Sequence, residues 1–486
     1  MIAAVIAAVF LGALDQTVIV AALPAVVVDL QIPFDQIDQA AWVVSGYLLG
    51  YTVALPVMGR LADVRGRRLT LAASLAVFAV GSIGCAISGS LATLVTARIA
   101  QAAGGGALLP VAIAIVSDRY PSERRALAIG VIGAVAEAGG VLGPLYGAGI
   151  IAALDWRWIF WINVPLAIIL LLGSLAGPRE SPRAGGQIDL VGAALIALAL
   201  GCQIAGLSHE AIDVGRLDVR DGLLTLAIAA LCAFIWWEVR AREPVLELRL
   251  FRSPEFAAAI GGGLVLGGAL IVAMVDVPLY AATVLNASAV DGGLLLMRLT
   301  AFIPVGAVLG GALAQRVSLR VPTALGFVTA AIGLGLMSTW GTSPSQSSLW
   351  LSLATAGLGF GLLIAPLATT AVNSSGQDRE ASAAALFSVS RLIGMTIGLS
   401  VLTAWGLQRF DRLAGQIPLP LPKAGESAAS TQAALVAYNE AILRIGAEVY
   451  REIFLAAGAI CLAGLVTVVF LRVGRRTLAL DRRDTT

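Results

Sequence analysis

Apolar stretches of about 20 residues or more recur along the whole chain and constrain its fold more than any other feature. The short links between them hold most of the charge, and only 13% of the 486 residues are charged, against about a quarter in a typical soluble protein. Helices that cross a lipid bilayer account for this pattern. A membrane β-barrel does not, because its segments are about 10 residues long and alternate apolar with polar residues. We therefore expect an all-α integral membrane protein.

The apolar stretches predict fourteen transmembrane helices. With the N-terminus placed in the cytoplasm, the inside loops and the tail hold 21 of the 32 Lys and Arg residues, whereas the outside segments hold 8. The positive-inside rule then places the N- and C-termini in the cytoplasm, which requires an even number of spans. The predicted spans cover residues 2–28, 40–58, 69–88, 91–116, 125–153, 157–177, 188–207, 222–239, 255–285, 290–314, 321–340, 348–373, 380–408 and 449–472.

An internal repeat predicts two pseudo-symmetric six-helix bundles plus two inserted helices. The loop 59–68 has a weaker counterpart that begins at Gly311, and the segment 123–143 has one at 378–398. Paired halves around a central site are a common plan of secondary transporters. The predicted domains are the bundles at 1–178 and 254–473, the two inserted helices with their linkers at 179–253, and a cytoplasmic tail at 474–486.

The segment 409–447 is an exception to the short links. It holds three prolines and then a helix-like, amphipathic stretch at 431–450. A link of this length is usually either functional or disordered. We predict an ordered periplasmic extension before the last span.

Of the charged side chains that fall within predicted spans, four are the main candidates for a site. A charge near the bilayer centre costs about 2.5–3.5 kcal/mol on insertion scales, so such residues usually face a wet cavity or a partner. We expect Asp15 and Glu137 to carry protons, and Arg98 and Arg391 to modulate them electrostatically. The sequence leaves open which arginine meets which acid, and purely structural salt bridges are the alternative.

Three further polar residues are additional candidates. Gln101 follows Arg98 by three positions, so the two share a helix face. Asp276 and Arg298 lie in predicted spans nine and ten and are candidates for the same charge network. A merely interfacial position is the alternative for both.

The loop between predicted spans two and three combines glycines, an acid and arginines at regular spacing. Gly59 and Gly66 permit a tight turn, and Asp63 can meet a helix end or an arginine of a neighbouring segment. A topology signal alone would need only arginines such as Arg67 and Arg68. We therefore predict a cytoplasmic gate, with a pure topology signal as the alternative.

These motifs carry a family resemblance. Over essentially its full length the chain resembles the fourteen-helix drug:proton antiporter branch of the major facilitator superfamily. The loop 59–68 is similar to the signature of that family between spans two and three, 98–106 to its span-four motif linked to proton coupling, and 14–17 to its span-one motif. The span-five antiporter motif of the branch is matched by Gly139, Gly143, Pro144 and Gly147.

Within that branch the chain is most similar to the mycobacterial exporters of triacylglycerides. The similar passages are scattered and include 106–110, 275–277, 390–395 and 405–410. The long outer segment before the last span also fits. Those exporters act with a periplasmic lipoprotein, so the resemblance implies such a partner here. Glu137 departs from many drug antiporters, which have an uncharged residue at this position.

Together these observations predict a proton-coupled exporter of lipidic or hydrophobic molecules in a bacterial inner membrane. A proton-coupled multidrug efflux antiporter for amphipathic cations is the nearest alternative, and a channel is disfavoured by the repeat. A membrane enzyme is not expected, because no cluster of histidine, cysteine or carboxylates has catalytic spacing. We expect a monomer that contacts membrane lipids, with the proton gradient as energy source and with no cofactor or metal. A nucleic-acid partner is not expected, because the net charge is only +2.

Overall fold

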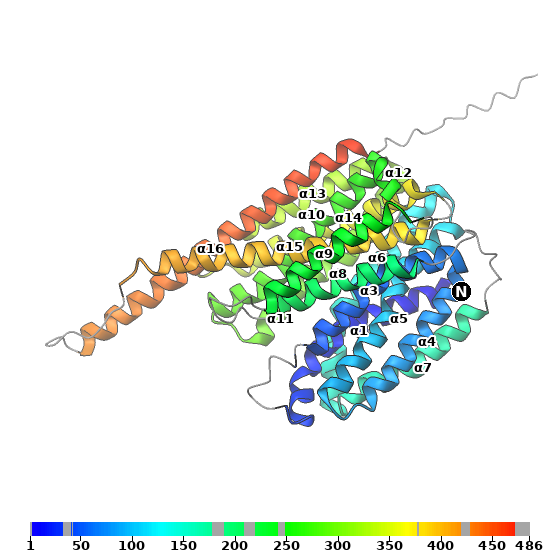
Figure 1. Ribbon diagram of the computed structural model, residues 1–486. Helices are drawn as coiled ribbons and strands as arrows, with labels where there is room; N and C mark the ends of the chain where they lie inside the picture. Colours follow the sequence, from blue (N-terminus) through cyan, green and yellow to red (C-terminus); the bar gives the residue numbers. More distant parts are fainter. Residues whose placement is uncertain are drawn as a thin grey trace, which may run out of the picture.

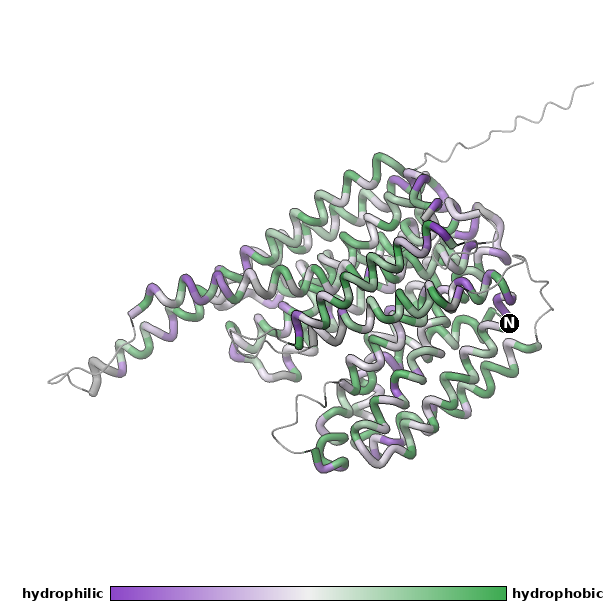
Figure 2. Tube along the Cα trace, viewed as in Figure 1, coloured by the Kyte–Doolittle hydropathy of each residue, from purple (hydrophilic) through white to green (hydrophobic). Residues whose placement is uncertain are grey.

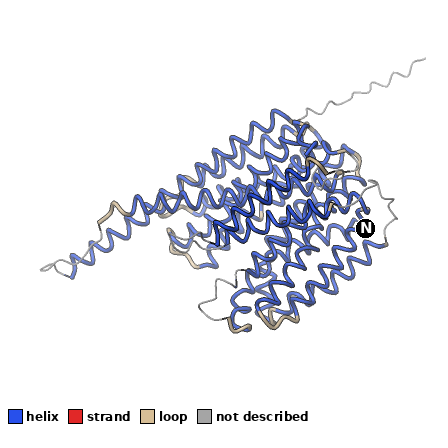
Figure 3. The backbone as a smooth tube through the Cα atoms, viewed as in Figure 1, coloured by secondary structure: helices blue, strands red, loops and turns tan. Residues whose placement is uncertain are grey.

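The computed structural model describes residues 2–32, 40, 42–176, 189–208, 219–241, 248–376, 379–418 and 428–471. Helices form nearly all of these ranges, and no strand occurs within them (Figure 3). The prediction of an all-α protein is confirmed. The predicted tail at 474–486 and part of the predicted extension, 419–427, lie outside the described residues.

The helices fall into two halves joined by an inserted pair (Figure 1). The first half contains α1 (Ile2–Asp29), α3 (Trp42–Arg65), α4 (Arg67–Ala86), α5 (Leu91–Arg119), α6 (Ser122–Ala153) and α7 (Arg157–Leu175). The inserted pair is α8 (Leu190–Ser208) and α9 (Val219–Glu238). The second half follows the short η2 (Leu248–Arg252) and contains α10 (Pro254–Thr283), α11 (Ala289–Thr300), α12 (Phe302–Arg316), α13 (Arg320–Met337), α14 (Gln346–Ser375), α15 (Glu380–Ala414) and α16 (Ala428–Phe470).

Thirteen helical segments of the described chain are long and apolar enough to cross a membrane. A shorter apolar helix, Val191–Gln203 within α8, stands where the remaining predicted span was expected. Hydrophobic residues predominate along the middle of the bundle, and hydrophilic residues gather toward its ends (Figure 2). The chain is therefore a multi-pass membrane protein, and the predicted count of fourteen is reached when α8 is included.

Two predicted spans differ from the observed helices. The span expected at 290–314 is interrupted, since α11 ends at Thr300 and α12 begins at Phe302. The last span, expected at 449–472, is the final part of α16, a single helix of 43 residues. The helix-like stretch that the sequence showed before that span is continuous with it.

The two ends of the bundle differ in shape. α1 begins and α16 ends at the same end, which we call the loop end because it also carries the turn between α3 and α4 (Figure 1). At the opposite end α15 and α16 protrude beyond the other helices, so we call it the extension end (Figure 1). Arg409 and Glu452 join these two helices through two hydrogen bonds of 2.9 Å.

An aromatic cluster packs α16 against the other helices of the second half, near the base of the extension. Tyr280 of α10 packs against Trp340 and Tyr450, with ring centroids 5.0 and 5.6 Å away. Phe454 of α16 completes the cluster, 5.6 Å from Trp340. The contacts of Tyr280 with Tyr450 and of Trp340 with Phe454 are edge-to-face, and such contacts stabilise by about 0.5–1.5 kcal/mol beyond burial.

The start of α7 closes the extension end of the first half. Arg157 donates to the Asp29 carboxylate at 2.6 Å and to the Ser88 carbonyl at 3.2 Å, so it ties α7 to α1 and to the end of α4. The hydrogen bond from Arg157 lowers the pKa of Asp29 below its ordinary value. Asp29 is therefore held as the ionised partner of this joint.

Candidate functional site

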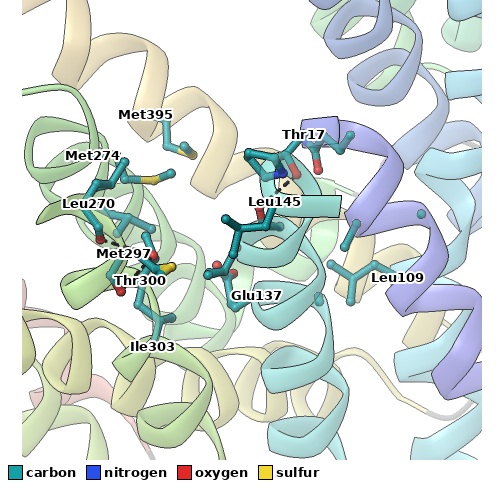
Figure 4. Close-up of a pocket in the computed structure, with 18 of the residues that line it drawn as sticks. Thr17, Leu109, Glu137, Leu145, Leu270, Met274, Met297, Thr300, Ile303 and Met395 are labelled. Atoms are coloured by element: carbon teal, nitrogen blue, oxygen red, sulfur yellow. Dashed lines mark hydrogen bonds between the residues drawn. The ribbon is translucent and has the colours of Figure 1, made fainter. Parts of the chain in front are cut away.

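A cavity of about 490 Å³ lies between the two halves of the molecule. α1, α3, α5 and α6 line it from one half, and α10, α11, α12 and α15 line it from the other. Figure 4 shows Thr17 and Glu137 on one side, and Met274, Met297 and Met395 on the opposite side. A central cavity between paired bundles is the expected position of a transporter's substrate site.

The halves meet closely at the loop end of this cavity. A Cβ atom added at Gly59 of α3 would lie 2.8 Å from the Ala385 Cβ of α15. At the repeat-related position, a Cβ at Gly311 of α12 would lie 2.6 Å from the Ala126 carbonyl oxygen of α6. Both glycines therefore permit helices of the two halves to come into close contact, and these contacts close the loop end of the cavity.

The cavity is less enclosed between α6 and α11. Leu145 of α6 lines it and is 52% exposed, and Val290 and Leu294 of α11 line it with exposures of 71% and 47%. Apolar side chains that face both a cavity and the surroundings leave this side unsealed. In a bilayer, this side of the cavity, between α6 and α11, would face lipid chains.

An ion pair connects the two halves within the cavity. Arg391 Nη1 of α15 donates to Glu137 Oε1 of α6 at 2.6 Å. The side chains are 21% and 19% exposed, and both line the cavity. Because the pair spans the interface between the halves, the halves can separate here only if this bond breaks.

A second ion pair lies wholly inside the first half. Asp15 of α1 is fully buried, and its Oδ2 accepts from Arg98 Nη1 at 2.8 Å. Its Oδ1 accepts from Gln101 Nε2 at 3.0 Å and from Asn163 Nδ2 at 2.6 Å. Every partner is a donor, so the cluster fits the ionised carboxylate. The guanidinium of Arg98 also lies 4.1 Å from the ring centroid of Tyr47.

The glycines of the predicted antiporter motif bring α6 against α1. The Thr17 hydroxyl of α1 donates to the Gly140 carbonyl of α6 at 2.9 Å, which adds a hydrogen bond between the two helices. Pro144 of the motif lines the cavity. The helix of Asp15 and the helix of Glu137 are thus packed as one unit. A Cβ atom added at Gly139 would come within 2.8 Å of the Phe10 carbonyl oxygen of α1. A Cβ atom added at Gly143 would come at least as close to the Leu14 carbonyl oxygen, and one at Gly147 to the Val18 carbonyl oxygen.

The segment 59–68, predicted as a loop, is helical except at Gly66, because α3 continues to Arg65 and α4 begins at Arg67; Gly59 therefore makes no turn. This segment connects the halves at the loop end. Asp63 accepts hydrogen bonds from the backbone N–H groups of Ala381 and Ser382, at 3.2 and 2.9 Å, and from the Ser382 hydroxyl at 2.6 Å. It therefore caps the N-terminus of α15, where the helix dipole favours an anion. Gly66 makes the turn, with a φ of 96° that favours glycine.

The arginines of this turn have different partners. Arg67 pairs with Glu380 at 3.0 Å, across the interface between the halves, and also with Asp118 of its own half. Arg68 instead donates to the carbonyl of Leu175 and so ties α4 to α7 within the first half. The contacts between the halves thus include Asp63 and Arg67.

The two remaining candidates lie outside both ion pairs. Arg298 donates to Gln346 at 2.8 Å and lies over the ring of Trp350, 4.8 Å from its centroid. Asp276 is buried in α10, and among the described residues no hydrogen bond reaches its carboxylate. The structure thus unites Asp15, Arg98 and Gln101, pairs Glu137 with Arg391, and leaves these two apart.

Sequence reasoning missed several groups in these clusters, among them Asn163 and Glu380. Asn163 bonds Asp15, and a polar amide in the middle of an apolar span is a signal that could have found it. Glu380 is 1% exposed and bonds Arg67, but it stands at a predicted span end, where charged residues are ordinary.

Comparison with known proteins identifies the family. Residues 5–399 match the Major Facilitator Superfamily. The chain belongs to this family. A triacylglyceride transporter of Mycolicibacterium hassiacum is 37% identical over 494 residues, covering 98% of this chain and 92% of the relative. A triacylglyceride transporter of Mycobacterium tuberculosis is 36% identical over 481 residues, covering 94% and 92%.

Solved structures of the family share the fold. The human organic anion transporter MFSD10 superposes with a TM-score of 0.58 at 16% identity, covering 96% of this chain and 98% of that chain. The proton:xylose symporter XylE gives 0.57 at 15% identity, covering 94% of each. The family membership makes this chain a membrane transporter and not an enzyme.

Proposed function

We propose that this transporter exports lipidic or hydrophobic molecules of the triacylglyceride kind across a bacterial inner membrane, driven by the proton gradient. The names of the relatives support the substrate class, since they are transporters of triacylglycerides at 35–38% identity. The central cavity and the paired halves support alternating access. In this proposal the loop end faces the cytoplasm with both termini, and the extension end faces the periplasm.

The charge of the cavity favours a neutral lipid over a cation as the substrate. Among the described lining residues Glu137 is the one carboxylate, and Arg391 neutralises it. Asp15 is fully buried inside the first half and does not line the cavity. An amphipathic cation would need an unpaired acid in its binding site, because a desolvated cation without a counter-charge is costly. A neutral, apolar substrate needs none, so this observation carries the proposal.

The Glu137–Arg391 bond is suited to couple substrate and proton. A proton on Glu137 removes the charge that holds Arg391, and it thereby weakens the link between the halves. Since both side chains line the cavity, a substrate and a proton act on the same bond. We propose that protonation of Glu137 permits the rearrangement that opens the loop end.

Asp15 is the second proposed proton site. Its three donors hold the ionised form, so protonation requires Arg98 to withdraw. The close packing of α1 on α6 connects such a change to Glu137. The protruding ends of α15 and α16 lie on the release side of the proposed path, and there we expect a periplasmic lipoprotein to accept the lipid.

The proposal is tested with the purified protein in lipid vesicles. One preparation is supplied with a radiolabelled triacylglyceride and another with ethidium, each with and without a pH gradient. We expect gradient-dependent movement of the triacylglyceride and none of ethidium. Movement of ethidium without the triacylglyceride would replace the lipid proposal by the drug antiporter.

A further inference from the structure

The two walls of the central cavity differ in chemistry. Three methionines line it, and all of them belong to the second half: Met274 of α10, Met297 of α11 and Met395 of α15 (Figure 4). Leu270 and Ile303 extend the same apolar wall (Figure 4). Methionine is flexible and polarizable, so such a wall adapts to acyl chains of varied shape.

Most polar side chains of the lining already have a partner. Thr17 donates to the Gly140 carbonyl, and Thr300 donates to the Leu296 carbonyl of its own helix. Glu137 and Arg391 bond to each other. None of these four groups is free to bind a ligand without giving up a contact.

Two polar residues of the first half remain available. Gln16 of α1 and Tyr51 of α3 line the cavity and are half-buried, and within the described chain neither side chain makes a hydrogen bond. Gln16 lies on the cavity face of α1 together with Val9, Gly12 and Ala13, at helical spacing. Tyr51 stacks on Tyr47, with ring centroids 6.2 Å apart, which holds its ring in place.

The available groups define what they can recognise. The Gln16 amide offers two N–H donors, and the Tyr51 hydroxyl offers one. An ester carbonyl has only acceptor oxygens and carries no charge, so it matches these donors in a cavity whose charges are already neutralised. We infer that Gln16 and Tyr51 recognise the ester groups of an uncharged long-chain lipid, whose acyl chains lie against the methionine wall. This inference rests on the proposed function and adds its specificity residues.

The test compares an ester with an ether that lacks carbonyl groups. The purified protein in vesicles is supplied with a triacylglycerol or with a trialkylglycerol ether of the same chain lengths, and initial rates give an ester-to-ether ratio. We expect a ratio on the order of tenfold for the unaltered protein, as two hydrogen bonds of ordinary strength would produce. Tyr51→Phe and Gln16→Met should each lower the ratio by about threefold, because each variant loses one of the two hydrogen bonds and the ester rate falls toward the ether rate.

Tyr120→Phe is the matched control. Tyr120 ends α5 at the loop end and does not line the central cavity, so its variant should keep the full ratio. Equal ester and ether rates in the unaltered protein, or an unchanged ratio in both cavity variants, would overturn the assignment while leaving lipid export intact. If neither lipid moves, the proposed function itself fails.

Discussion

At the scale of single residues, the two acid–arginine pairs within the membrane-spanning helices differ in how far they are exposed. Asp15 and Arg98 are both 0% exposed, whereas Glu137 and Arg391 are about one-fifth exposed to the cavity. The buried pair depends on its neighbours for every hydrogen bond. The cavity pair is open to the cavity, so in the proposed mechanism it is the better placed of the two to respond first.

Glu137→Gln should abolish the stimulation of transport by a pH gradient. The amide keeps the shape of the side chain but binds no proton, and it also lacks the charge that holds Arg391. We expect gradient-driven lipid flux to fall by about tenfold or more, equivalent to at least about 1.4 kcal/mol on the limiting step. Flux in vesicles is the measurement. Glu440→Gln, at an exposed position of α16, should leave it unchanged.

Asp15→Asn should lower the stability of the protein. It leaves Arg98 buried without a counter-charge and places an amide N–H group among three donors. Removing one partner of a buried pair typically costs about 3–5 kcal/mol. Thermal unfolding in detergent should show a clear loss, and adding Arg98→Met should recover part of it because no unpaired charge remains. An unaltered melting temperature in Asp15→Asn would show that the pair does not stabilise the fold.

At the scale of elements, two contacts between helices make separate predictions. Asp63→Asn weakens the cap on α15 and so favours separation of the halves at the loop end. A cap is worth about 1 kcal/mol, which corresponds to about a fivefold shift in population. Spin labels on the two halves at the loop end should report more long distances. A distribution identical to that of the unaltered protein would remove Asp63 from the gate.

Gly143→Ala should loosen the packing of α1 on α6. The new methyl group would lie 2.7 Å from the Leu14 carbonyl oxygen, closer than Cβ atoms normally approach. Overpacking of this kind typically costs about 1–3 kcal/mol. Gly149→Ala is the control in the same helix, because nothing lies within 4 Å of its added Cβ. Equal melting temperatures and equal flux in the two variants would contradict the role given to the motif.

At the scale of the whole molecule, the arrangement of helices was predicted from the sequence more completely than the side-chain contacts between them. Apolar length and charge asymmetry are properties of each segment, so they predicted nearly every helix. They did not reveal the break at Ala301, although Pro304 follows it and has no N–H to bond the Thr300 carbonyl. The position of Asp15, Glu137, Arg98 and Arg391 within predicted spans identified them as candidate site residues. Their pairing depends on how helices rotate and pack across separations of 83 and 254 residues, which no local pattern encodes.

In the proposed mechanism, lipid and protons move in one cycle. Vesicles that contain the protein and a pH-sensitive dye in their lumen can be given a triacylglyceride gradient without any initial pH difference. We predict that the lipid gradient alone drives protons across the membrane in the direction opposite to the lipid, and that Glu137→Gln abolishes this signal. Lipid movement with no change in luminal pH would contradict the coupling.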